Sequence, residues 1–96
     1  LGFAGIFARS DVIGLAAMRA LAAAGRSVPG EVAVVGFDDS VAAQHATPSL
    51  SSVRKDLEVG ARTMVDLLFR RMAGEDVTGV LAPVRLIPRE SSAPAT

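Results

Sequence analysis

Two adjacent carboxylates, Asp38 and Asp39, follow directly after an unbroken apolar run at residues 32–37. Apolar runs of this kind are typical of strands that are buried on both faces of a parallel sheet. In such sheets, ligands bind just beyond the carboxyl ends of the strands. The pair can therefore bind Mg²⁺, accept hydrogen bonds from a hydroxylated ligand, or accept hydrogen bonds from the backbone of its own loop.

The other polar residues argue against metal and catalytic chemistry. Lys55 is the only lysine, and it does not follow the strands in the order that a phosphoacceptor site of the receiver-domain kind requires. His45 is the only histidine, and it has no partners at the spacing of a zinc site or a catalytic triad. The G-x-S-x-G, G-x-G-x-x-G and P-loop patterns do not occur. We therefore expect no metal, no cofactor and no catalytic residues.

The composition excludes several further classes of protein. The 96 residues suffice for one small domain or for part of a larger one. The 10 basic and 10 acidic residues balance, and the aromatic residues are four phenylalanines, so the chain lacks the footprint of a nucleic-acid-binding domain. Without cysteine, disulfides and thiolate chemistry are excluded, and no apolar run reaches the length of a membrane span.

The chain is apolar for its size. Half of its residues are apolar, and the mean hydropathy is +0.40. We expect part of this apolar surface to meet a partner or a further part of the same protein. The chain also begins at Leu1, within an expected strand, and we therefore interpret it as a fragment of a longer protein.

A predicted βαβ unit would position the carboxylates. Its elements are a strand at 1–8, a helix from 11 to about 24, a turn at 28–30 and a strand at 32–37. Ser10 and Asp11 are residue types that cap helix N-termini, and Gly25 suits a helix end. Because such crossovers are right-handed and join parallel strands, Ser10-Asp11 and Asp38-Asp39 are predicted to lie at the same edge of the sheet.

The second half of the chain adds a second helix and a fourth strand-like segment. We predict a loop or short helical turn at 40–50, an extended crossing segment at 50–53, a helix at 56–73, an edge strand at 84–87 and a disordered tail at 91–96. The doublets Arg54-Lys55 and Arg70-Arg71 are interpreted as solvated residues at helix ends. The predicted fold class is α/β with parallel strands.

Four segments of the chain occur together in one known family. They are residues 7–11 (FARSD), 28–39 (VPGEVAVVGFDD), 48–53 (PSLSSV) and 85–92 (RLIPRESS). In this order and spacing they resemble the C-terminal part of the effector-binding region of lactose/galactose-repressor type (LacI/GalR) transcription regulators. The resemblance covers nearly the whole chain.

The resemblance implies a partial periplasmic-binding-protein-like domain of type I, in which two α/β subdomains close around a small molecule. It divides the chain into part of the C-subdomain (1–47), a hinge crossing (48–55), a helix and loop of the N-subdomain (56–79), a returning strand (80–90) and a tail (91–96). The helix-turn-helix domain of such regulators would precede these residues.

The resemblance also implies roles for individual residues. Asp38 matches the family's ligand-binding Asp, and Ser10 stands where many members have a ligand-contacting Asn, whose amide Ser lacks. The implied ligand-binding residues are Asp38, Ser10, Lys55 and Leu57, and the implied dimer-interface residues are Leu15, Met18, His45 and Ala46. Asp39 is expected to serve the loop behind it, and Asp11 to act as a helix cap.

The implied function is the sensing of a small molecule, a sugar or related metabolite, within a dimeric cytoplasmic transcription regulator. Such a protein contacts DNA only through its N-terminal domain, has no membrane partner and is not an enzyme. The alternative is a sugar-binding transport or sensor protein of the periplasmic type without DNA binding. An enzyme on a flavodoxin-like half domain is a more distant alternative. We also expect the isolated chain to associate with itself, because its apolar faces would be uncovered.

Overall fold

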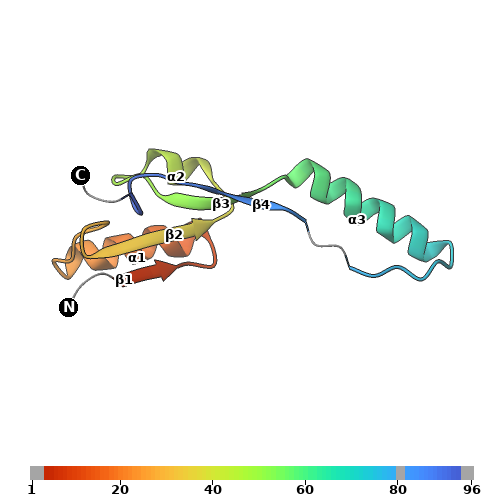
Figure 1. Cartoon of the computed structure of the whole chain (residues 1–96), viewed down its shortest axis with the longest axis horizontal. Coiled ribbons are helices and arrows are strands. Elements are labelled where there is room, and N and C mark those ends of the chain that lie inside the picture. The colour runs from red at the N-terminus through yellow and green to blue at the C-terminus, as the bar shows by residue number, and fades with distance from the viewer. Residues whose placement is uncertain (1–3, 80–81, 94–96) are drawn as a thin grey trace. The chain divides into compact units, whose positions relative to one another are not determined.

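A computed structural model describes residues 4–79 and 82–93 of the chain. Its elements are β1 (Ala4–Phe7), α1 (Asp11–Ala23), β2 (Val32–Phe37), α2 (Val41–His45), β3 (Ser51–Lys55), α3 (Leu57–Met72) and β4 (Val84–Ile87), as labelled in Figure 1. The chain forms two compact units, Leu1–Arg54 with Arg85–Thr96, and Lys55–Val84, which we call unit 1 and unit 2.

The described strands form one sheet in the order β1-β2-β3-β4. β1 and β2 are parallel, with Ala4 opposite Val32, and β2 and β3 are parallel, with Val35 opposite Ser51. Figure 1 shows α1 lying along β1 and β2. The predicted parallel βαβ unit is therefore confirmed, and so is the α/β fold class.

Helix α1 begins and ends with the residues that its sequence predicts. The Ser10 hydroxyl accepts a hydrogen bond from the Ile13 amide at 3.2 Å, so Ser10 is the N-cap. Just past the helix, Gly25 has a φ of 75°, a left-handed conformation that glycine adopts without steric cost. The cap role predicted for Asp11 is wrong, because Ser10 fills that position and leaves the Asp11 carboxylate to bond elsewhere.

The core of unit 1 is small. Its buried apolar residues are Met18, Val34, Ala43 and Leu50, with Leu15, Leu21 and Val28 among the residues that pack against them. α2, which was predicted only as a loop or short helical turn, is a helix of one to two turns that contributes Ala43 to this core. Its N-cap is Ser40, whose hydroxyl accepts from the Ala43 amide at 3.2 Å.

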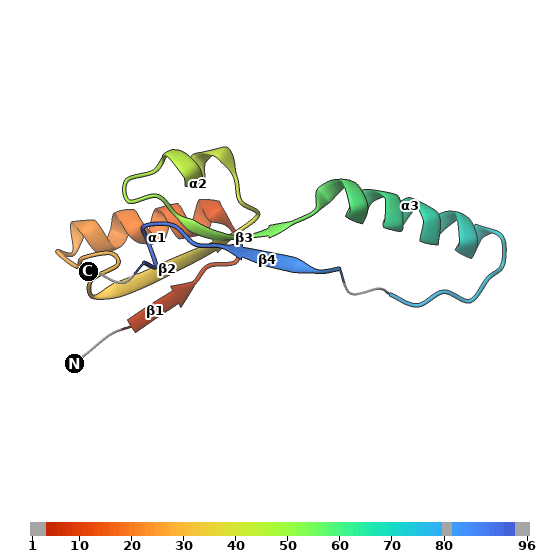
Figure 2. The same cartoon turned by 45° about the horizontal axis from the view of Figure 1, so that its top comes forward.

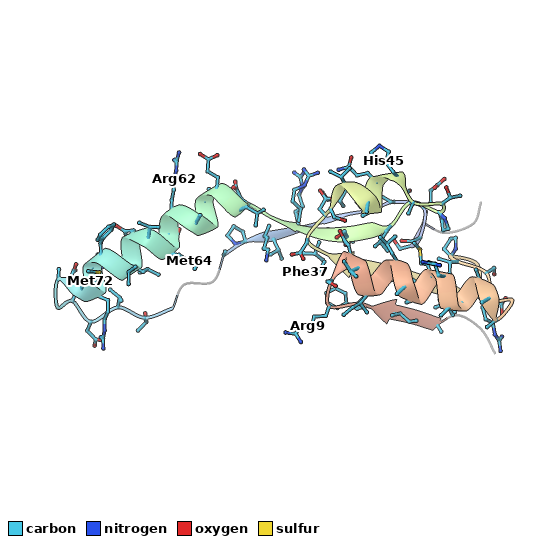
Figure 3. The ribbon with its side chains drawn as sticks, turned by 180° about the vertical axis from the view of Figure 1, so that it is seen from behind. Arg9, Phe37, His45, Arg62, Met64 and Met72 are labelled. Atoms are coloured by element: carbon cyan, nitrogen blue, oxygen red, sulfur yellow. The ribbon has the colours of Figure 1, made fainter. Side chains whose placement is uncertain are left out.

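Unit 2 consists mainly of α3, which Asp56 caps through a 3.1 Å hydrogen bond from the Val59 amide. No residue of α3 is buried, and large apolar side chains such as Met64 and Phe69 are 72% and 63% exposed. Arg62 and Met64 project from different sides of the helix (Figure 3). The large apolar side chains left exposed on α3 agree with the apolar surplus of the sequence.

The C-terminal segment contradicts one prediction. Residues 91–96 were expected to be a disordered tail, yet Ser91 is completely buried and hydrogen-bonded within unit 1. Figure 2 shows the chain continuing from β4 past β3 toward the region of α2. Residues 94–96 lie outside the described part of the chain. The small, polar composition of the segment after Pro88 predicts disorder, but composition does not reveal hydrogen bonds to distant strands.

Candidate functional site

The ends of β1 and β2 meet at one edge of the sheet, as predicted. The Asp11 carboxylate, which follows β1, accepts a hydrogen bond from the Ser40 amide, which follows β2, at 2.5 Å. Its other oxygen accepts from the Ser52 hydroxyl of β3 at 2.6 Å. Asp11 is only 3% exposed, so its role is to join three segments at this edge rather than to contact a ligand.

Asp39 lies at the same edge and is held by two arginines. Its carboxylate pairs with Arg89 at 2.5 Å and with Arg54 at 2.7 Å, and its side chain is 5% exposed. Its backbone amide donates to the Ser52 hydroxyl at 2.8 Å. Asp39 therefore serves its own loop, as expected. Arg54 is exposed, as predicted, but it lies in β3 and not at a helix end, and it is paired with Asp39.

Burial by itself raises the pKa of Asp39, because a charge is less stable away from water. The hydrogen bonds and charges of Arg89 and Arg54 outweigh this effect, so the pKa of the carboxyl lies below its usual value. The ionised form is thus the one that the folded protein favours. Asp39 therefore stabilises the fold at pH values above the pKa that its carboxyl has in the unfolded chain. This stabilisation is lost as the pH falls through the lower pKa that the carboxyl has in the folded protein.

We predict a matching difference in acid stability between the wild type and Asp39→Asn. The wild type should lose unfolding free energy as the pH falls below about 4, the ordinary carboxyl pKa. The variant should be less stable at neutral pH and should show a shallower loss in that acid range. Urea denaturation at a series of pH values measures both slopes. Equal slopes for the two proteins would contradict the assignment of this ion pair as a source of stability.

Asp38 differs from Asp39 in both exposure and backbone conformation. Its side chain is exposed at the carboxyl end of β2, while its amide donates to the Val53 carbonyl of β3 at 2.9 Å. Asp38 and Asp39 have φ angles of 109° and 54°, which L-residues other than Asn and Asp rarely adopt. Backbone strain of this kind costs about 1–3 kcal/mol per residue and persists where the surrounding contacts enforce it.

The other predicted ligand residues fall into both units. Ser10 stands at the same strand-end edge as Asp38, with its hydroxyl engaged as the α1 cap. Figure 3 places Arg9 and Phe37 at this end of the βαβ unit. Lys55 ends β3, and Leu57, which is 69% exposed, begins α3; both belong to unit 2. The structure thus places Ser10 and Asp38 at the same edge of the sheet, and the ligand-binding roles of Asp38, Ser10, Lys55 and Leu57 stay predictions.

Three of the four residues predicted for a dimer interface line a groove beside α1. This groove has a volume of about 460 Å³, and its lining includes Leu15, Met18 and Ala46. Met18 is 7% exposed and belongs to the core of unit 1, so packing accounts for most of its surface. His45 is exposed on α2, where its ring Nδ1 lies 3.0 Å from the Val41 carbonyl (Figure 3). Their interface role stays a prediction.

Neither a metal site nor a membrane span is found in residues 4–79 and 82–93. These residues contain no group of three or more His, Cys, Asp or Glu side chains that could hold a metal ion. No helix formed by them has the length and apolarity needed to cross a bilayer.

Comparisons with known proteins identify the family. A profile described as a periplasmic binding protein-like domain matches residues 4–92. The chain is 50% identical over 82 residues to the HTH-type transcriptional regulator CelR of Thermobifida fusca, an alignment that covers 85% of this chain and 23% of CelR. It is 40% identical over 88 residues to a lactose operon repressor of Rhizobium radiobacter, covering 91% of this chain and 78% of that sequence. The chain belongs to the LacI/GalR family of transcription regulators.

Solved structures of LacI/GalR regulators support the same assignment. A complex of the regulator CelR with cellobiose superimposes with a TM-score of 0.78 at 47% identity, covering 91% of this chain and 27% of that one. A lac repressor dimer bound to operator and the anti-inducer ONPF gives a TM-score of 0.79 at 31% identity, covering 92% and 31%. The chain therefore spans about a quarter to a third of these regulators. The predicted periplasmic-binding-protein-like fold is confirmed, and the relatives favour a regulator over a transport protein.

Proposed function

We propose that this chain is the sugar-sensing portion of a LacI/GalR transcription regulator. The observation that carries the proposal is the exposed residue Asp38 at the carboxyl end of β2, held in a strained backbone conformation at the same sheet edge as Ser10. A carboxylate there accepts hydrogen bonds from sugar hydroxyls, and the strand-end edge is where ligands of α/β sheets bind. The role is binding rather than catalysis.

Cellobiose is the first ligand to test, because the regulator in the CelR–cellobiose complex is 47% identical to this chain. A neutral sugar also suits the exposed edge, where the Asp39 carboxylate is already paired with Arg54 and Arg89 and Asp38 supplies one acceptor group. Lys55 and Leu57 are the candidates for further ligand contacts from unit 2.

The regulatory logic is a shift between conformations of the whole protein. A ligand that binds one arrangement of the two subdomains more tightly than another changes the population of each, and thereby the affinity for DNA. The separation of the chain into two compact units near Arg54 and Arg85 supports the division into two subdomains joined by crossing strands. DNA contact would come from a helix-turn-helix domain on the N-terminal side, in a cytoplasmic homodimer.

We predict that Asp38→Asn weakens cellobiose binding by the intact protein about 10–100-fold, because a charged acceptor of sugar hydroxyls is replaced by a neutral amide. The fold should persist, since Asn tolerates the left-handed conformation. Isothermal titration calorimetry measures the affinity, and urea denaturation checks the stability.

Two further variants sharpen this test. Asp38→Gly should also weaken binding while leaving the protein as stable as the wild type or slightly more so, because glycine relieves the strain at φ 109°. Glu31→Gln removes an exposed ion pair with Arg26 in the same unit and should change neither property. Wild-type affinity in Asp38→Asn would refute the assignment of Asp38 as the ligand anchor.

A further inference from the structure

The contacts around Asp39 form a clamp, which we define as Asp39, Arg54 and Arg89. The two carboxylate oxygens of Asp39 are divided between the arginines, with Oδ1 bound by Arg89 and Oδ2 by Arg54. The second terminal nitrogen of Arg89 donates to the Leu50 carbonyl at 2.9 Å, which fixes the orientation of its guanidinium. The Arg89 side chain is 14% exposed, and that of Arg54 is 47% exposed. The clamp is thus buried on one side and open on the other.

The clamp joins the loop after β2 to both places where the chain passes between the units. Arg54 is the last residue of the first segment of unit 1 and lies in β3. Arg89 lies two residues after the end of β4, and its backbone amide donates to the Ser51 hydroxyl at 2.7 Å. The Asp39 carboxylate therefore binds the last residue before the chain enters unit 2, Arg54, and a residue shortly after the chain re-enters unit 1, Arg89.

The same loop carries Asp38 in a conformation that its own sequence does not favour. Three successive amides, those of Asp38, Asp39 and Ser40, donate to Val53, Ser52 and Asp11 respectively. The first two of these bonds hold the backbone only while β3 stays next to the loop, and Asp39 supplies the direct side-chain link to Arg54 of β3 and to Arg89. Without that link, two residues with positive φ angles can relax toward ordinary conformations.

We propose that Asp39 is a positioning residue that fixes the exposed Asp38 carboxylate for the ligand and couples this loop to both crossing strands. The inference rests on the proposed function, since it takes Asp38 as the ligand anchor. A purely stabilising ion pair would leave the loop conformation unchanged when broken. A positioning pair controls the loop itself, so loop order and ligand affinity must change together.

The test uses the intact protein and two measurements. Hydrogen exchange at the amides of residues 38–40 reports loop order without any ligand, and calorimetry with cellobiose reports affinity. In Asp39→Asn we expect these amides to exchange about tenfold faster and cellobiose to bind about tenfold more weakly, because the anchor loses its fixed geometry. Arg89→Lys keeps the positive charge but loses the simultaneous contacts of the guanidinium with Asp39 and the Leu50 carbonyl, and it should retain more cellobiose affinity than Arg89→Gln.

Control variants separate this inference from the proposed function. Asp38→Asn should lose affinity while its loop amides exchange as in the wild type, and Glu31→Gln should change neither measurement. Should Asp39→Asn fail to fold, Arg54→Gln breaks the more exposed arm of the clamp and should show the same two changes at smaller amplitude.

Two results would overturn the proposal. One is faster loop exchange in Asp39→Asn with wild-type cellobiose affinity, and the other is unchanged exchange at residues 38–40. Should the wild type not bind cellobiose, the proposed ligand is wrong, and hydrogen exchange becomes the deciding measurement. Exchange that rises more at residues 38–40 than in the core strands supports positioning, and an unchanged rate or a uniform rise along the chain refutes it.

Discussion

Replacing Gly36 with alanine should destabilise the intact protein by about 3–5 kcal/mol. Gly36 lies in β2, where a Cβ would overlap the Asp11 carboxylate and would stand 3.0 Å from Leu50 Cδ2. The Asp11 carboxylate cannot retreat without giving up its hydrogen bonds to Ser40 and Ser52. The substitution therefore disturbs both the core at Leu50 and the strand-end edge at Asp11. We expect the ligand affinity to fall along with the free energy of unfolding.

Gly5→Ala is the matched control for this variant. Gly5 lies in β1 of the same sheet, and among residues 4–79 and 82–93 a Cβ there would meet only the Ala33 carbonyl, at an ordinary distance of 3.9 Å. We expect its unfolding free energy to stay within about 0.5–1 kcal/mol of the wild type. Urea denaturation of the three proteins measures the difference. Equal stability of the two variants would show that the space beside Gly36 is not limiting.

Ser91→Ala should cost about 2–4 kcal/mol, although it removes a single oxygen near the end of the chain. The Ser91 hydroxyl donates to the Val34 carbonyl at 2.6 Å and accepts from the Ser51 amide at 2.8 Å. β2 and β3 begin to pair only at Val35 and Ser51, so Ser91 completes the hydrogen bonding of β2 just before β3 starts. Alanine would leave two buried backbone groups without partners.

Ser27→Ala provides the comparison for that variant. The Ser27 hydroxyl also makes two contacts, both with Glu31, but in an exposed turn where water can replace them. Its unfolding free energy should stay within about 0.5 kcal/mol of the wild type. Thermal unfolding followed by circular dichroism ranks the three proteins. A Ser91→Ala variant as stable as Ser27→Ala would mean that the C-terminal segment does not complete the core.

The elements of this fold follow closely from local sequence signals. The apolar run at 32–37 is β2 from first residue to last, and Ser10, Gly25 and Asp56 mark helix ends through their own side chains or φ angles. These signals act between neighbours in the chain, so they can be read without knowledge of the tertiary structure. The parallel arrangement of β1 and β2 also follows, because two strands joined by a single crossover helix of this length run parallel, and such crossovers are right-handed.

The errors of prediction all involve contacts between distant segments. Asp11 was expected to cap its own helix, Arg54 to stand at a helix end and Ser91 to be disordered, yet each bonds a residue that lies 15 to 57 positions away in the chain. Polar residues have no periodicity that reveals which distant group they will meet. The one sequence signal of these contacts was the pair Ser51-Ser52, two small polar residues in a predicted extended segment. Both side chains are completely buried, which is unusual for serine and requires hydrogen-bond partners from other segments.

The sequence by itself determined that the chain is part of a LacI/GalR effector domain and that Asp38 and Asp39 end a buried strand. Only the tertiary structure decided how these neighbours divide their work. Asp39 is drawn into the clamp with Arg54 and Arg89, because a nearly buried carboxylate needs charged partners, and Asp38 is left exposed at the edge. Two identical residues in one motif thus differ through what surrounds them, which the linear sequence does not specify.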